Sequence, residues 1–530
     1  MSMRAPTAGS GTREVFATRG AFIFAAIGSA IGLGNIWRFP YVAYESGGGA
    51  FIIPYLVALL TAGIPILFFD YALGHRSRGS APLSFKAIHR RAEPIGWFQT
   101  GVATMIGIYY AAIIGWSAMY AWFSVTHAWG DDADSFFFGS FLQVPDLESG
   151  ASAFGFDFVP AVLIPLVLVW VVILAILLGG VQKGIAGINK IFVPLLVILF
   201  AIMVVRALFL PGALTGLDAL FTPDFAALAD PQVWIAAYGQ IFFSLSVAFG
   251  IMITYASYLK RRTNLTGSGM VVAFSNSGFE ILAGIGVFAA LGFMANAAGS
   301  GVDEVASSGI GLAFVAFPTL ISQMPGGALF GILFFGSLFV AGVTSLISIV
   351  QVPVAAISDK FNISNRASVL LVGGIMAVVS ILTMGTATGM YVLDTIDAFA
   401  NNIGIVGAAV VALIVLVWLL RKLPVLKAHL NAVSSFKLGG YWTVTLGVIT
   451  PVVLIYMLVS QIIEYAVNGY EGYPTAFLGV FGWGMIGLLV VLSFVLTAIR
   501  WPRATEERLQ KTLEENDDLE QNPSTFGTEK

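Results

Sequence analysis

The chain has 530 residues, of which 58% are hydrophobic and only 10% are charged, and its formal net charge is −3. Soluble domains carry about 25% charged residues, so this composition excludes an ordinary soluble fold and indicates a chain surrounded by lipid. The sequence contains no cysteine, which excludes disulfide bonds between its loops. With four histidines and no paired carboxylates in its apolar segments, it offers no convincing catalytic group, and we expect no enzyme.

Twelve segments are apolar enough to cross a bilayer, which takes about 20 mostly apolar residues in an α-helix. They cover residues 17–44, 48–75, 94–127, 158–179, 184–210, 231–259, 266–296, 326–358, 366–386, 389–421, 439–467 and 474–500. The longest segments exceed the hydrocarbon thickness and must tilt or break. We therefore predict an all-α polytopic membrane protein with twelve transmembrane helices.

Lysine and arginine gather in alternate connections between these segments. The basic connections are 76–91, 183–190, 260–262, 360–366 and 421–437. The positive-inside rule then predicts a multi-pass protein of the plasma membrane with both termini in the cytoplasm. We expect residues 1–16 to be a cytoplasmic segment without a cleavable signal peptide, and the acidic residues 501–530 to be a disordered cytoplasmic tail.

Two of the predicted spans contain features that a simple membrane anchor does not need. The first contains G-S-A-I-G-L-G-N-I-W-R-F-P over 28–40, and the sixth contains G-Q-I-F-F-S-L-S-V-A-F-G over 239–250. Glycine weakens a helix by about 0.5–1 kcal/mol relative to alanine. Glycine and serine also favour close helix packing in lipid, which is the simpler interpretation. The alternative is unwinding, because an irregular backbone is tolerated in a membrane where it lines a cavity.

The two spans are the first and the sixth, so each begins a block of five. Interrupted helices at matching positions indicate a transporter built from two inverted repeats, with its binding site at the membrane midplane. We predict a 5+5 inverted repeat over residues 17–210 and 231–421, with helices 1 and 6 unwound at mid-membrane. Two extra helices are expected over 439–500.

Few charged residues lie within the spans, and each needs a partner there. We expect Arg38 and Asp397 to pair across an outer vestibule, and Arg13 and Asp359 to form an inner gate, although each could meet lipid headgroups independently. Glu280 lies four residues after Asn276, so both project from one helical face. Glu280 is then either a structural hydrogen-bonded carboxyl or a fixed negative charge beside bound cations.

Sodium can be bound by carbonyl, hydroxyl and amide oxygens, which suits a membrane interior that holds few carboxylates. Such groups occur within the spans at Asn35, Ser244, Asn276, Thr344 and Ser345. A Thr-Ser pair in a membrane helix often bonds its own backbone carbonyls instead. Spacing alone leaves both alternatives open.

The motif over 28–40, followed by Y-E-S-G-G-G-A-F over 44–51, resembles the first-helix signature of the neurotransmitter:sodium symporter family. The similarity continues in order through V-W-I-A-A-Y-G-Q-I-F-F-S-L-S over 233–246, T-Y-A-S-Y over 254–258 and A-G-V-T-S over 341–345. The similarity covers residues 13–400. Within the family, the sequence resembles the bacterial amino-acid branch that includes the leucine transporter. The resemblance implies a sodium-coupled symporter that moves a small, neutral, apolar amino acid of the methionine, alanine or leucine class by alternating access.

The family's binding positions transfer to this sequence one by one. The resemblance implies a substrate site formed by Ser29, Ala30, Gly32, Leu33, Gly34, Ile106, Tyr110, Phe243, Ser244, Ser246, Phe249, Ser345 and Ile349. It implies two sodium ions: the first on the Ala30 carbonyl, Asn35, Ser244, Asn276 and the substrate carboxylate, and the second on carbonyls of Gly28, Ile31 and Ala341 and hydroxyls of Thr344 and Ser345. Arg38 and Asp397 would close the outer side, and Arg13, Asp359 and Tyr258 the inner side.

Several positions bear on the substrate and the ions. Gly32 stands where monoamine carriers have aspartate, which implies a substrate with its own carboxylate. Glu280 stands where chloride-dependent members have serine, which implies chloride-independent transport. Among departures from the leucine transporter are Ser29, Ser244, Leu346 beside the pocket, and Phe16 in place of an inner-gate tryptophan.

We expect the partners to be an amino acid, sodium and the lipid bilayer, with no nucleic acid. A sensor on the same fold, which binds an amino acid without transporting it, is the main competing interpretation, and the acidic tail is the only feature that supports it. The sequence does not determine an accessory subunit or the oligomeric state.

Overall fold

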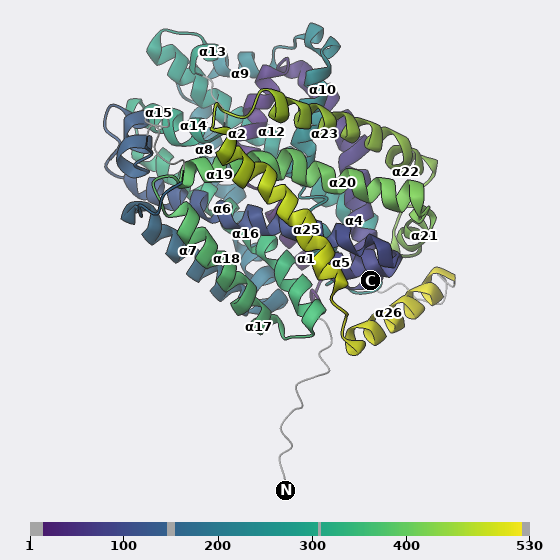
Figure 1. Ribbon diagram of the computed structural model, residues 1–530. Helices are drawn as coiled ribbons and strands as arrows, with labels where there is room; N and C mark the ends of the chain where they lie inside the picture. The colour runs from purple at the N-terminus through teal and green to yellow at the C-terminus, as the bar shows by residue number, and fades with distance from the viewer. Residues whose placement is uncertain (1–13, 146–153, 306–308, 522–530) are drawn as a thin grey trace.

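The computed structural model describes residues 14–145, 154–305 and 309–521, and helices account for most of them (Figure 1). Within these described ranges, ten helical stretches are long and apolar enough to cross a membrane. They are Gly49–Ser77 (α3, Ile52–Ala58, and α4, Ile64–Ser77), Arg90–Phe123 (α6, Glu93–Phe123), Pro160–Leu178 (α7), Val181–Leu208 (α8, Gly187–Leu208), Leu265–Ala298 (α12), Gly327–Phe361 (α16), Asn365–Met384 (α17, Asn365–Ser368, and α18, Gly374–Met384), Gly389–Leu419 (α19, Gly389–Phe399, and α20, Val406–Leu413), Gly440–Val467 (α22, Gly440–Val444, and α23, Thr450–Val467) and Thr475–Ala498 (α24, Thr475–Phe477, and α25, Met485–Ala498).

Two further spans are interrupted. Helices α1 (Arg19–Ala30) and α2 (Leu33–Glu45) form one span that bends by 55° at its break. Helices α10 (Pro231–Ser244) and α11 (Ile251–Ala256) form the other, with residues 245–250 outside any helix. With the bent first span, eleven of the twelve predicted spans are long and apolar enough in the described residues, and the shorter pair α10–α11 occupies the predicted sixth. Both predicted breaks are present, in the first and the sixth predicted spans.

Short helices occupy the connections at the two ends of the bundle. They are α5 (Ala81–Ile88), α9 (Ala213–Phe221), α13 (Val302–Val305), α14 (Gly309–Gly311), α15 (Phe317–Gln323) and α21 (Leu423–Val433). In Figure 1, α17 and α21 lie at one end of the molecule and α9 and α13 at the other. We call these ends the α17 end and the α9 end.

Two helix pairs form the centre of the bundle. Helix α16 packs along α6, and α4 packs on α11. The α4–α11 approach depends on Gly74, because a Cβ atom at that position would lie 1.9 Å from the Ile253 carbonyl oxygen. Glycine permits this direct backbone contact. The second half of the sixth span, α11, therefore packs directly against the backbone of α4.

The outside of the bundle is apolar. Val171 of α7, Ile198 of α8, Ile375 of α18, Val452 of α23 and Val491 of α25 are all exposed. Large exposed apolar surfaces are rare on soluble monomers and mark contact with another apolar phase. This belt of side chains is the surface that lipid would cover.

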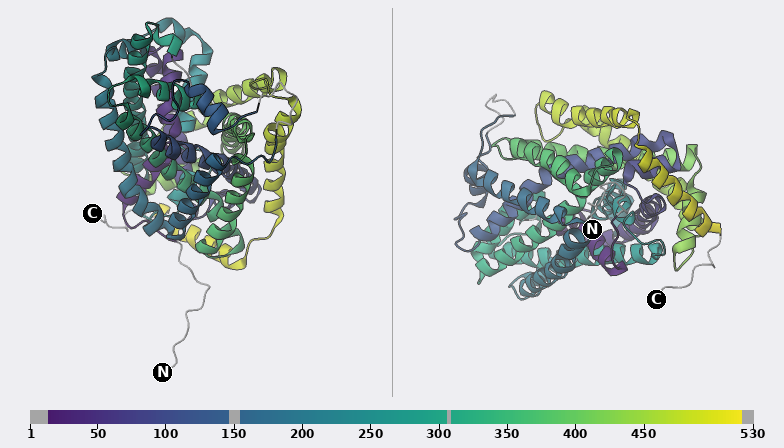
Figure 2. Two further views of the ribbon diagram at one scale, coloured as in Figure 1. Left: turned by 90° about the vertical axis from the view of Figure 1, so that its left-hand side faces the viewer. Right: turned by 90° about the horizontal axis from the view of Figure 1, so that it is seen from below.

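The predicted disorder of residues 501–530 is wrong for most of that segment. Residues Arg503–Gln521 form helix α26, which lies at the α17 end, across the ends of the spans (Figures 1 and 2). Its acidic side chains meet basic side chains of the bundle, as in the Arg76–Asp517 ion pair of 2.5 Å. Those partners supply the stabilisation that the composition of the segment alone does not show. Residues 522–530 lie outside the described part.

Candidate functional site

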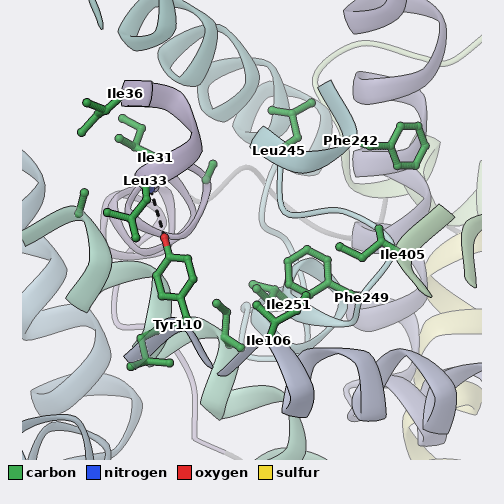
Figure 3. Packing of buried hydrophobic residues seen from close by; sticks show 14 of the residues in the cluster. Ile31, Leu33, Ile36, Ile106, Tyr110, Phe242, Leu245, Phe249, Ile251 and Ile405 are labelled. Atoms are coloured by element: carbon green, nitrogen blue, oxygen red, sulfur yellow. Dashed lines mark hydrogen bonds between the residues drawn. The ribbon is translucent and has the colours of Figure 1, made fainter. Parts of the chain in front are cut away.

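A cavity of about 50 Å³ lies between the two helix breaks. It is lined by Ser29, Ala30, Gly32, Leu33, Gly34, Asn35, Ile106, Tyr109, Tyr110, Phe243, Ser246, Phe249, Ser345, Ile349, Asn401 and Ile405. None of these side chains carries a charge. Figure 3 shows the Tyr110 hydroxyl directed at the start of α2, where it accepts a hydrogen bond of 3.2 Å from the Leu33 N–H.

The structure brings most of the predicted substrate residues to this cavity. Of the thirteen predicted, only Ser244 lies away from its lining, and it faces Asn276 instead. Leu346, which the sequence placed beside the pocket, is buried but does not line the cavity. Three lining residues were missed: Tyr109, Asn401 and Ile405.

Gly32 limits what the cavity can hold. A Cβ atom on Gly32 would lie 3.0 Å from the Tyr110 hydroxyl oxygen and 3.1 Å from the Ser345 hydroxyl oxygen. A longer side chain at this position would displace both hydroxyls. The cavity therefore keeps its backbone groups accessible because residue 32 has no side chain.

The first cluster of oxygen atoms joins both breaks to α12. The Gly32 N–H donates to Asn35 Oδ1 (2.8 Å), and Asn35 Nδ2 donates to Asn276 Oδ1 (2.9 Å). Asn276 Nδ2 in turn donates to the Ser244 hydroxyl (3.0 Å). All three side chains are buried. The structure thus places together the side chains of the first predicted sodium site, as a neutral donor set.

The second cluster joins α1 to α16. The Ser345 hydroxyl oxygen lies 3.4, 3.3 and 3.4 Å from the carbonyl oxygens of Gly28, Ser29 and Ile31. One hydroxyl proton can serve only one of these carbonyls at a time. The Thr344 hydroxyl bonds the Ala341 carbonyl in its own helix (2.9 Å), as the alternative interpretation of the Thr-Ser pair anticipated.

These donor sets suit a weakly charged cation. Neutral carbonyl, amide and hydroxyl oxygens match an alkali ion, whereas transition metals favour imidazole and thiolate ligands. Among the described residues, no three His, Cys, Asp or Glu side chains converge to form a metal site.

Glu280 lies behind the first cluster and is fully buried. The Tyr55 hydroxyl donates a short hydrogen bond to Glu280, and Gln240 Nε2 donates another of 2.6 Å. The Tyr55 hydroxyl oxygen also lies 2.8 Å from Ser277 Oγ, close enough to accept a hydrogen bond from that hydroxyl. A carboxyl held by two donors beside Ser244 and Asn276 is both hydrogen-bonded and close to the first cluster, so the geometry accommodates both earlier interpretations of this residue.

A model of the sodium:neurotransmitter symporter family matches residues 13–137 and 131–504. The chain belongs to the sodium:neurotransmitter symporter family. This symporter is 41% identical over 490 residues to an uncharacterised sodium-dependent transporter of Methanocaldococcus jannaschii, with 92% of this chain and 97% of that protein covered.

Two other similar proteins are known with a substrate or a bound amino acid. The sodium- and chloride-dependent GABA transporter 2 of Bos taurus is 31% identical to this chain over 421 residues. The matched region covers 74% of this chain and 70% of the Bos taurus protein. The crystal structure of MhsT in complex with L-phenylalanine is similar with a TM-score of 0.72 and 32% identity, covering 85% of this chain and 100% of MhsT. Its fold agrees with the predicted all-α architecture.

A second, wider cavity of about 830 Å³ adjoins the central one. Leu33, Gly34, Tyr110 and Phe243 line both. It extends past Trp37 and Tyr41 of α2 to the connection that holds Glu471. This symporter therefore has a broad approach to its central cavity from one side.

Arg38 and Asp397 both line the wide cavity, but the predicted ion pair between them is not formed in this structure. The Arg38 guanidinium lies over the Phe243 ring, 4.9 Å from its centroid. Asp397 accepts a short hydrogen bond from the Tyr109 hydroxyl and another of 2.8 Å from Asn401. The two charges face the same space with different partners, because the cavity between them is open.

The opposite side of the central cavity is packed with aromatic rings. Phe16 is buried, and its ring lies 5.8 Å from Phe22, 5.9 Å from Tyr255 and 6.2 Å from Tyr258, between ring centroids. The Tyr258 hydroxyl accepts a hydrogen bond of 2.7 Å from Gln351. We call Phe16, Phe22, Tyr255 and Tyr258 the inner aromatic cluster.

Only one residue of the predicted inner ion pair, Asp359, lies in the part of the chain that the structure describes. Arg13 lies outside the described residues. Asp359 is buried at the end of α16, where it accepts hydrogen bonds from the Ser80 N–H (2.8 Å) and from Arg508 (2.7 Å). Arg508 belongs to α26, so the segment predicted to be a solvated tail supplies a partner to the predicted gate carboxylate.

Proposed function

We propose that this protein is a sodium-coupled symporter of a neutral, apolar amino acid. The observation that carries the proposal is a cavity without charged side chains that lies between two helix breaks. A zwitterion supplies its own charges, and interrupted helices present backbone N–H groups and carbonyls to receive them. A substrate with a net charge would find no charged partner in this lining.

The substrate carboxylate is proposed to bind at the start of α2. The N–H groups of Leu33 and Gly34 begin that helix, and the Tyr110 hydroxyl is already bonded to the first of them. A helix N-terminus favours a negative group. The amino group would bind the carbonyls of Ala30, Phe243 and Ser246, at the end of α1 and in and after α10.

The side chain of the substrate is proposed to bind among Ile106, Phe249, Ile349 and Ile405, which line the cavity. Apolar walls select by size and by exclusion of charge. Methionine and alanine are our first candidates, with leucine next. MhsT, crystallised with L-phenylalanine, makes a larger apolar side chain the natural competitor to test.

Two sodium ions are proposed, one at each oxygen cluster. The first ion would also bind the substrate carboxylate, because Asn35 belongs to the first cluster and lines the cavity in which the substrate would lie. There Asn35 accepts a hydrogen bond from the Gly32 N–H. A substrate that ligates the ion makes each binding event favour the other. The second ion would take the carbonyls around Ser345, where one hydroxyl proton faces three oxygens.

Glu280 is proposed to make transport independent of chloride. Its buried carboxyl group accepts a hydrogen bond from Gln240 and lies next to Ser244, which is part of the first oxygen cluster. A negative charge near a bound cation offsets the cation's charge in a low-dielectric interior. A chloride ion would supply the same charge in a relative that lacks this carboxyl.

Transport is proposed to proceed by alternating access, with the described conformation open to the outside. The wide cavity would be the outer vestibule, closed when Arg38 reaches Asp397, and the inner aromatic cluster would close the cytoplasmic side. This assignment places the α17 end in the cytoplasm, in agreement with the basic connections.

A panel of the twenty amino acids tests the proposal. Purified protein is expected to bind a small set of apolar amino acids only in sodium, and vesicles containing it are expected to accumulate the same amino acids when a sodium gradient is imposed. Binding without accumulation would instead support a sensor. Equal binding in sodium and in choline would contradict sodium coupling.

A further inference from the structure

Helix α26 contacts two separate parts of the bundle through its charged side chains. Its first half meets α5 and α16 through Lys86–Glu506 (2.5 Å) and Arg508–Asp359 (2.7 Å). Its second half meets α4 and α21 through Arg76 and His429. Glu520 lies 3.1 Å from each of these two side chains. Arg261, which follows α11, pairs with Glu515.

The buried contacts of α26 are specific. Asn516 Nδ2 donates to the Arg76 carbonyl at 2.7 Å, and the Thr505 hydroxyl donates to the Asp359 carbonyl at 3.1 Å. Leu509 packs with Leu83, Trp97 and Trp501 in a small apolar cluster. A loosely associated tail would leave these groups in water, so α26 is a built part of this end of the molecule.

The entry of the chain into α26 is fixed at the end of α16. Lys360 Nζ forms a fully buried ion pair of 2.9 Å with Glu93, and Trp501 Nε1 donates to the same carboxylate at 2.8 Å. Lys360 also lies over the Trp501 ring, 4.3 Å from its centroid. Removing one partner of such a buried pair is strongly unfavourable. The start of α26 therefore moves with α16 and α6.

The far half of α26 is attached to the other pair of helices. Arg76 belongs to α4, and Arg261 follows α11. Alternating access in inverted-repeat transporters proceeds by one group of helices rocking against another. A 19-residue helix that is fixed to α16 at one end and to α4 at the other resists that separation at the cytoplasmic end.

We propose that Arg508 is a gate residue of this symporter: α26 brings it to Asp359, and its release is part of opening the inner side. The Asp359 side chain is only 5% exposed and uses one oxygen for Ser80 and the other for Arg508. Breaking the contact between Arg508 and Asp359 removes one charge-assisted hydrogen bond from the closed state. The inference rests on the proposed function, because it assigns Asp359 to the inner gate.

The absence of cysteine allows a direct test. A single S348C substitution places a thiol beside Tyr255 of the inner aromatic cluster, where the native Ser348 hydroxyl lies 2.6 Å from the tyrosine hydroxyl. Inverted membrane vesicles expose the cytoplasmic side to a membrane-impermeant maleimide. Labelling is measured in sodium without substrate, which favours the outward-open state.

On this background, Arg508→Ala is expected to speed labelling about tenfold, the size of effect that loss of one charge-assisted hydrogen bond produces. Arg508→Lys is expected to restore slow labelling in part, because a charge without the guanidinium fork keeps one contact. Lys511→Ala, which removes an exposed cation from the same helix, is the matched control and is expected to label like the parent.

The outcomes separate the two proposals. Sodium-driven uptake is measured for every variant in reconstituted vesicles, together with its thermal unfolding. A wild-type protein without sodium-driven uptake would count against the proposed function. A parent that transports, with Arg508→Ala and Lys511→Ala labelled at the same rate, would overturn the gate assignment. Should Arg508→Ala fail to fold, Arg508→Gln, which retains hydrogen-bonding reach, gives the same comparison.

Discussion

The two ends of the central cavity are built differently. On the side of the wide cavity, which we propose to be the outer side, Arg38 and Asp397 face a cavity of about 830 Å³ and have separate partners. On the opposite side, which we propose to be the inner side, four aromatic rings are packed together and a helix lies across the ends of the spans (Figure 1). An outer gate of two side chains can open without unpacking any helix, whereas the inner side opens only when buried contacts between helices are broken.

The largest effect is expected at the outer side. Asp397→Ala removes the proposed partner of Arg38 and the acceptor of Tyr109 and Asn401. Uptake of the preferred amino acid is expected to fall by about 100-fold, because a buried charge without its partner is strongly unfavourable. Asp134→Ala, which removes another carboxylate lining the same cavity, is the control and is expected to change uptake little. Normal uptake in Asp397→Ala at equal membrane levels would remove the outer gate from the mechanism.

The next effect concerns the second oxygen cluster, at the centre between the two ends. Ser345→Ala removes the hydroxyl that faces three carbonyls. We expect the sodium concentration for half-maximal uptake to rise about tenfold, which corresponds to the loss of one ligand of about 1.4 kcal/mol. Ser337→Ala is the control, because that hydroxyl only bonds the Leu333 carbonyl of its own helix. An unchanged sodium dependence would place the second ion elsewhere.

A change in ion dependence is expected at Glu280. Glu280→Ser removes the buried carboxyl that Tyr55 and Gln240 hold, and uptake is expected to require chloride. Replacing chloride by gluconate should leave the parent unaffected and lower uptake by the variant about fivefold, as loss of one nearby charge predicts. If gluconate and chloride support the variant equally, the proposed role of Glu280 is wrong.

The smallest effect is expected at the rim of α26. Asp517→Asn removes an ion pair with Arg76 whose acidic side chain is 51% exposed, while Glu520 remains bonded to the same arginine. Exposed ion pairs contribute about 0–1 kcal/mol, which is at most about a fivefold change, so maleimide labelling on the S348C background should change less than about fivefold. A change as large as that of Arg508→Ala would show that the whole helix, rather than its contact with Asp359, controls the inner side.

The sequence predicted the centre of the molecule better than its edges. Both breaks carry glycine and serine in a run that is otherwise apolar, so local composition is sufficient to locate them. Asn401 and Ile405 were missed because they lie in a span without such a signal. Their position at the cavity follows from how that span packs against the others.

The docking of α26 was missed for a different reason. Seven acidic side chains between Arg503 and Gln521 dominate its composition, and composition was the basis for predicting disorder. A periodic signal is nevertheless present: Thr505, Leu509, Thr512 and Asn516 recur at helical spacing and are all buried. Only one of the four is strongly apolar, so a hydrophobic pattern does not identify the stripe.

The position of α26 in the chain has a consequence for biosynthesis. The ribosome translates residues 503–521 after all twelve spans, so the spans enter the membrane before Arg508 exists to reach Asp359. A nascent or prematurely terminated chain would therefore carry the spans without the contacts that α26 makes at the α17 end, including the one between Arg508 and Asp359. If α26 holds that end closed as proposed, completion of translation is also the step that installs this closure.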